Sequence, residues 1–97
     1  MGREVRLFKS EERKSRNEVV SFLRALAGKI EEGRVVLKQG GEELALELPQ
    51  NLILDIQAED EDKGQKGTQR SLEVEIKWFE GGQDDSGQGS GGPLELG

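Results

Sequence analysis

The sequence predicts an α+β fold of order β-α-β-β-β-β, in which one amphipathic helix packs on a largely antiparallel five-stranded sheet. Three observations lead to this prediction. One stretch repeats apolar residues at steps of three and four, which is the period of a helix. Five other stretches alternate apolar with polar residues, as strands with one buried face do. After residue 79 both patterns stop, and a Gly- and Ser-rich tail follows.

The helix is expected from about residue 16 to residue 32. Ser15 and Glu18 have the spacing of a capping box, in which each side chain bonds the backbone amide of the other residue. Gly33 follows as the residue that can turn left-handed at no extra cost. Gly28 costs about 1 kcal/mol relative to Ala and suggests a close approach to the sheet. The apolar stripe consists of Val19, Phe22, Leu23, Leu26, Ala27 and Ile30.

The strands are expected on either side of this helix. Gly40-Gly41 predicts a tight turn that joins the second and third strands as a hairpin. Pro49 lacks an amide donor and should end the third strand. The last four strands are expected to form a meander, with a polar loop over residues 59–70, whereas nothing fixes the pairing of the first. The predicted strands are residues 3–9, 34–39, 44–48, 52–58 and 72–78.

The composition leaves little catalytic chemistry. The 97 residues include no Cys, no His and no Tyr, which excludes disulfides, thiolate zinc sites and His-based catalysis. We therefore expect no enzyme, no catalytic residue, no cofactor and no metal. A small hydrolase is the remaining enzymatic alternative, but nothing in the sequence brings two carboxylates together. The available ones are Glu42, Glu43, Asp55 and Asp60.

Two polar segments resemble ligand loops but lack the required spacing. In the acidic run 59–62, a calcium loop counted from Asp60 would need Gly at its sixth position and Glu at its twelfth. Gln65 and Ser71 stand there instead. The segment 64–67 has two glycines but not the Lys-Ser/Thr ending of a phosphate loop. Both segments are interpreted as solvated loop.

The leading functional hypothesis is a non-enzymatic interaction module. Four apolar residues fall in the register opposite to the helix-facing set, and together they could form a protein-binding patch on the outer face of the sheet. Isolated exposed apolar residues are the equally favoured interpretation. Through this face and the sheet edges the module would bind a protein partner or form a homodimer. The four are Phe8, Val36, Ile53 and Phe79, whereas Trp78 is interpreted as a core anchor.

The alternative hypothesis is association with nucleic acid. The net charge is −6, yet residues 1–24 carry seven Lys/Arg and only four Asp/Glu. This basic segment could contact phosphates, although the net charge opposes it. A further alternative is an acidic inhibitor that mimics nucleic acid. The candidate phosphate contacts are Arg3, Arg6, Lys9, Arg13, Lys14 and Arg16.

The patterned region resembles the amphi-Trp domain family over residues 3–79, without the tail. The matching features are the segment Val5–Phe8, the helix that opens with Ser15-x-x-Glu, the Glu-Glu-Gly that closes it, the leucine-alternating strand before Pro49, and the segment Ser71–Trp78. The resemblance implies no reaction, ligand or site residue.

The expected organisation is one α+β domain over residues 1–79 and a flexible, acidic tail over residues 80–97. No apolar run approaches the ~18 residues of a membrane span. The first residues lack the apolar stretch of a signal peptide. We therefore expect a cytoplasmic protein with no membrane partner.

Overall fold

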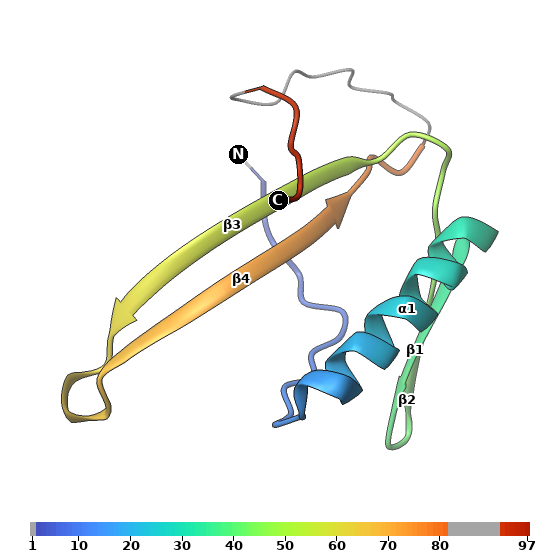
Figure 1. Cartoon of the computed structure of the whole chain (residues 1–97). Helices are drawn as coiled ribbons and strands as arrows, with labels where there is room; N and C mark the ends of the chain where they lie inside the picture. The colour runs from blue at the N-terminus through green and yellow to red at the C-terminus, as the bar shows by residue number, and fades with distance from the viewer. Residues whose placement is uncertain (1, 82–91) are drawn as a thin grey trace. The chain divides into compact units, whose positions relative to one another are not determined.

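The computed structural model describes residues 2–81 and 92–97, so most of the predicted tail lies outside the described residues. The chain divides into two compact units, Met1–Gln50 and Asn51–Gly97, and its elements together are of the α+β kind (Figure 1). In chain order the elements are α1 (Arg16–Glu32), β1 (Arg34–Gln39), β2 (Glu42–Glu47), β3 (Ile53–Asp62), the 3-10 turn η1 (Gly64–Lys66) and β4 (Thr68–Lys77).

The predicted five-stranded sheet is wrong. The strands form two separate two-stranded sheets, β1–β2 and β3–β4, each antiparallel. Alternation predicts which side chains of a strand share a face, but it does not specify which distant strands pair. The expected meander stops at the connection between β2 and β3, where Pro49 offers no amide to a ladder.

The predicted first strand is also absent. Residues 2–15 form neither helix nor strand. Val5 and Leu7, which the predicted strand 3–9 places on the helix-facing side opposite to Phe8, are 71% and 67% exposed. A strand gains its hydrogen bonds only from a neighbouring strand. The segment therefore has too few apolar residues among its many charges to stabilise pairing with a neighbouring strand.

The first unit contains the helix with the predicted ends. The Ser15 amide donates to Glu18 Oε1 at 2.9 Å, and the Glu18 amide donates to Ser15 Oγ at 3.2 Å. Gly33 has φ 88°, and its amide donates to the carbonyls of Lys29 and Ile30. A Cβ built on Gly28 would meet nothing within 4 Å, so the expected close approach to a sheet is not observed.

The core of the first unit lies where α1 packs against β1. Val35 is buried at 7% exposure. It pairs with Leu46, and Leu37 pairs with Leu44, so these four side chains share one face of the hairpin. The last three are half-buried. Val36 pairs with Ala45 on the opposite face.

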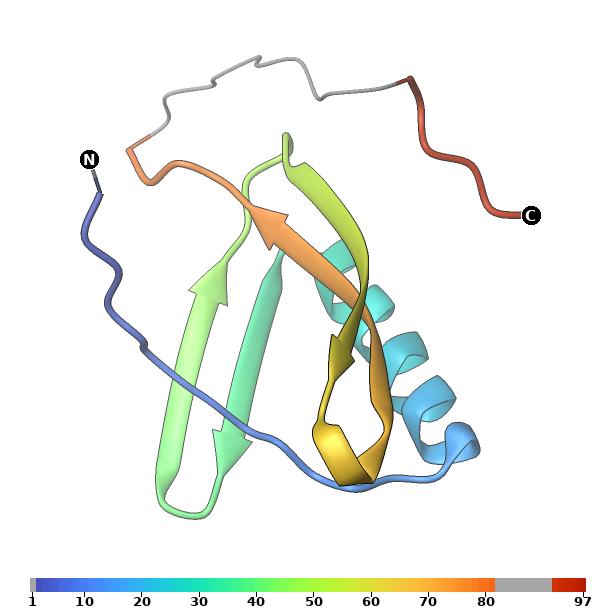
Figure 2. The same ribbon diagram turned by 90° about the vertical axis from the view of Figure 1, so that its left-hand side faces the viewer.

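The second unit is built on a long hairpin whose strands extend beyond the predicted ends. β3 and β4 have ten residues each and pair along their whole length. The predicted loop 59–70 is therefore reduced to residues 63–67, which include the single turn η1 (Figure 2). Gly64 and Gly67 have φ 68° and 92° and allow this tight connection. Within this extension the Asp60–Arg70 ion pair joins the two strands.

Candidate protein-interaction surface

One face of the β3–β4 hairpin is apolar over three successive cross-strand pairs. Directly opposed residues of an antiparallel pair lie on the same face, and every second pair repeats that face. Three such pairs follow one another: Leu54 with Ile76, Ile56 with Val74, and Ala58 with Leu72. The name "hairpin face" is used below for these six residues.

The hairpin face is largely exposed. Leu72 is 73% exposed, and Leu54 and Val74 are each 58% exposed. Ile56 and Ile76 are half-buried. A two-stranded hairpin is at best marginally stable in water unless its apolar face is covered. The hairpin face therefore has the chemistry of a surface that gains stability from an occupant.

The opposite face of the hairpin is acidic. Asp55 lies directly opposite Glu75, an arrangement in which like charges repel. Lys77 offsets this repulsion, because its Nζ lies 3.4 Å from Asp55 Oδ2 and 4.0 Å from Glu75 Oε1. Further acidic residues on this face are Glu59, Glu61 and Glu73.

An ion pair bounds the hairpin face next to the loop. Arg70 donates from Nε to Asp60 Oδ1 at 2.7 Å and from Nη2 to Asp60 Oδ2 at 3.1 Å. These hydrogen bonds hold the pKa of Asp60 below its ordinary value. They also raise the pKa of Arg70 above its ordinary value. The apolar face thus ends at a locally neutral pair rather than at a free charge.

The acidic run 59–62 forms the last part of β3 and makes local polar contacts. Besides the Asp60 pair, Glu61 lies 3.3 Å from Lys63 Nζ, and Asp62 Oδ1 accepts from the Gly64 amide at 2.8 Å. Within residues 2–81 and 92–97, no group of three acidic side chains is arranged to hold a metal ion.

The aromatic residues after β4 lie at the other end of the hairpin. Trp78 is half-buried, and its Nε1 donates to Glu80 Oε2 at 3.0 Å. Phe79 is 52% exposed. The indole therefore has a polar partner for its single donor, which is the usual condition for partial burial of a tryptophan.

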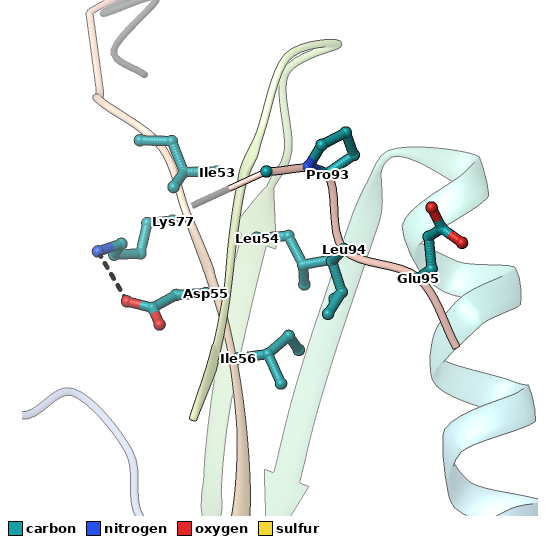
Figure 3. Close-up of a pocket in the computed structure, with 9 residues that line it drawn as sticks. Ile53, Leu54, Asp55, Ile56, Lys77, Pro93, Leu94 and Glu95 are labelled. Atoms are coloured by element: carbon teal, nitrogen blue, oxygen red, sulfur yellow. Dashed lines mark hydrogen bonds and ion pairs between the residues drawn. The ribbon is translucent and has the colours of Figure 1, made fainter. Parts of the chain in front are cut away.

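A pocket of about 560 Å³ lies at the end of the hairpin where β3 begins. It is lined by Ile53–Ile56 and Lys77 on one side and by Gly92–Glu95 on the other (Figure 3). Figure 3 shows the side chain of Leu94 on the side of β3 that carries Leu54 and Ile56. The segment 92–97 thus shares a pocket with part of the hairpin face.

The four residues of the predicted outer face do not share one sheet. Phe8 precedes α1 and is half-buried, and Val36 on β1 is 36% exposed. Both belong to the first unit, whereas Ile53 and Phe79 belong to the second. Ile53 is 38% exposed and opposes Lys77 on the acidic face of the hairpin. A common binding face of these four residues stays a prediction.

The predicted phosphate contacts lie along the irregular N-terminal segment. Five of the six basic residues fall within residues 2–15, and Arg16 opens α1. Lys9 and Lys14 pair with acidic neighbours, at 4.0 Å from Glu11 and 3.8 Å from Glu12. The basic charges are therefore partly compensated locally.

The sequence model of the Amphi-Trp domain family matches residues 1–96. The chain belongs to the Amphi-Trp domain family. The match extends beyond the predicted limit of residue 79 and includes Pro93–Leu96. No curated protein and no solved structure matches this chain. No helix in the described ranges is long and apolar enough to cross a membrane.

The predicted five-stranded sheet places the hairpin face on the helix-facing side, opposite to Ile53 and Phe79, and it gives Leu94 no role. One signal could have corrected the first assignment. A 17-residue helix is about 25 Å long, and its single apolar stripe is too small to cover one face of a five-stranded sheet. For Leu94, the signal was two leucines in strand-like alternation after a stretch without any apolar residue.

Proposed function

We propose that this Amphi-Trp protein is a non-enzymatic interaction module, which binds a second copy or another protein through the hairpin face and the adjoining strand edges. The observation that supports the proposal most directly is the exposure of three successive apolar cross-strand pairs. Contiguous apolar surface of this kind marks interaction sites. Unpaired edges of a two-stranded sheet add backbone donors and acceptors for a partner strand.

The strength of such an interaction can be bounded. Each side chain of the hairpin face regains on the order of 1 kcal/mol when its exposed part is covered, so two opposed faces supply roughly 12 kcal/mol. Association costs about 4–15 kcal/mol in lost freedom of motion. A cost of about 4–8 kcal/mol gives weak to moderate self-association, with a Kd between about micromolar and millimolar.

Sedimentation equilibrium tests the proposal. The intact chain is compared with Leu72→Ser/Val74→Ser, which removes the centre of the hairpin face, and with Glu73→Gln on the opposite face of the same strand. We expect the average mass to rise with concentration for the intact chain and for Glu73→Gln, but not for the double variant. Circular dichroism establishes that all three are folded.

The proposal fails if two results occur together. The first is a constant monomer mass for the intact chain up to about millimolar concentration. The second is recovery of the same proteins from a lysate by the intact chain and by Leu72→Ser/Val74→Ser. Recovery of proteins from a lysate by the Phe8→Ser/Phe79→Ser variant tests separately whether the predicted outer face contributes to binding.

A second candidate function has one observation in its favour. The acidic face carries Asp55, Glu59, Glu61, Glu73 and Glu75 on paired strands, and side chains two residues apart along a strand repeat about every 6.6 Å. Such a row could occupy the basic groove of a nucleic-acid-binding protein. Binding that is lost at high salt and in Glu73→Gln/Glu75→Gln would support this candidate, and binding insensitive to both would exclude it.

The proposal assigns no catalytic residue, cofactor or metal to the protein. The cytoplasmic location of the protein stays a prediction. Nucleic-acid binding through the basic N-terminal segment also stays a prediction. Filter binding of the intact chain to RNA and DNA at rising salt concentration tests that alternative, since phosphate contacts weaken steeply with salt.

A further inference from the structure

The segment 92–97 combines features that set it apart from the Gly- and Ser-rich sequence before it. Its residues Pro93-Leu-Glu-Leu96 include two leucines, whereas residues 80–92 contain no apolar side chain. Proline favours an extended backbone and loses little entropy on binding. An extended segment with alternate apolar side chains is the kind of ligand that a sheet accepts.

The structure brings this segment to the hairpin. Gly92–Glu95 and Ile53–Ile56 line one pocket, in which Leu94 lies on the side of Leu54 and Ile56 (Figure 3). Leu94 is 59% exposed, whereas Leu96 is 96% exposed. The two leucines therefore differ in environment, and Leu94 is the one directed to the hairpin.

The length of chain between the two described stretches permits this arrangement. Ten residues, 82–91, separate the two described stretches, and a chain of ten residues can span up to about 35 Å. Two groups joined by a chain of this length meet at an effective concentration on the order of millimolar. Even a contact of millimolar intrinsic affinity is then populated about half of the time. The family match, which continues to residue 96, includes this segment in the domain.

We propose that the segment 92–97 is an intramolecular ligand of the hairpin face, with Leu94 as its apolar anchor against Leu54 and Ile56. The bound segment covers the end of the face where β3 begins and leaves Leu72 exposed near the loop. Its release is required before a partner can use the whole face. This regulatory consequence rests on the proposed function, whereas the contact itself does not.

Paramagnetic NMR tests the contact in the full chain. The chain has no cysteine, so Gly97→Cys provides a single attachment point for a nitroxide label. We expect the label to broaden the amide signals of Leu54 and Ile56 more than that of Glu61, which lies about 23 Å further along the strand than Leu54. Leu94→Ser should abolish this difference, and Leu96→Ser is the matched control that should preserve it.

A mixed sample separates contacts within one chain from contacts between chains. Isotope-labelled chain without nitroxide is combined with unlabelled chain that carries it. The intramolecular contact would be overturned if the Leu54 signal broadened as much in this mixture as in the isotope-labelled chain that carries its own nitroxide. Uniform broadening along β3, or a gradient that survives Leu94→Ser, would also overturn it.

Sedimentation of Leu94→Ser tests the regulatory consequence. If the segment occupies the face about half of the time, its release should tighten self-association by about fourfold, because both chains of the dimer need a free face. An unchanged association constant would show that the segment 92–97 does not compete with a second copy for the hairpin face. If no variant associated at all, the proposed function itself would be overturned. The paramagnetic experiment decides the contact in either case.

Discussion

Each of the two units contains an antiparallel hairpin, and the two hairpins differ in how exposed their apolar side chains are. In the first unit α1 packs against β1, and Val35 is reduced to 7% exposure. In the second unit the described residues include no helix longer than the turn η1, and Leu72 retains 73% exposure. The same alternation of apolar and polar residues thus accompanies a buried valine in the first unit and exposed side chains in the second.

The largest expected difference between the units is in the cost of removing an apolar side chain. Val35→Ala should lower the free energy of unfolding of the first unit by about 2 kcal/mol, because it leaves a cavity under α1. Val74→Ala on the hairpin face should cost the second unit less than about 1 kcal/mol. Urea titration followed by circular dichroism for α1 and by Trp78 fluorescence for the hairpin measures both.

Equal costs for the two substitutions would contradict the comparison. A loss of about 2 kcal/mol or more for Val74→Ala would mean that the hairpin face is covered in solution. The apolar side chains of the second unit would then be buried, as Val35 is in the first.

A smaller contrast lies within the first unit, at two glycines of the helix region. Gly33→Ala should cost about 1–2 kcal/mol, because its φ of 88° is strained for a residue with a Cβ. Gly28→Ala should instead stabilise the helix by up to about 1 kcal/mol, since the added methyl meets nothing within 4 Å. Thermal unfolding followed by circular dichroism measures the two shifts. A destabilising Gly28→Ala would mean that this side of α1 is covered.

The smallest expected effect concerns the acid sensitivity of the hairpin. Arg70 lowers the pKa of Asp60 in the folded state, so the pair stabilises the hairpin above the ordinary pKa of an aspartate. This stabilisation is lost as the pH falls through the lowered folded pKa. Asp60→Asn should therefore remove part of the acid dependence of hairpin unfolding below about pH 5.

Trp78 fluorescence during urea unfolding at several pH values provides the measurement. Glu18, whose pKa is lowered by its hydrogen bonds with Ser15, contributes an acid dependence to the first unit that Asp60→Asn leaves in place. An identical pH profile of the hairpin with and without Asp60 would show that the Arg70 pair does not contribute.

The parts of the fold that depend on local sequence could be predicted. The capping box of Ser15 and Glu18 lies within one turn, and Gly33 ends the helix by its own backbone freedom, so both helix ends agree with the structure. Gly40-Gly41 closes a hairpin between adjacent strands, and this pairing is also confirmed. These features require no knowledge of distant contacts.

The parts that depend on distant partners could not be predicted. Residues 3–9 alternate like a strand, but no local signal says whether another strand will pair with them. The acidic run beyond Ala58 looks like a loop, because the Asp60–Arg70 pair that extends β3 joins residues ten positions apart. The exposure of Leu72 and the position of Leu94 follow from packing between segments, which the alternation of apolar residues does not specify.

Methyl NMR over a range of concentrations tests most directly whether the hairpin face is an interaction surface. As the concentration rises from about micromolar to about millimolar, we predict progressive shifts of the Leu72 and Val74 methyl signals with an unchanged Val35 signal. Constant Leu72 and Val74 signals, or shifts of equal size at the buried Val35, would contradict this account.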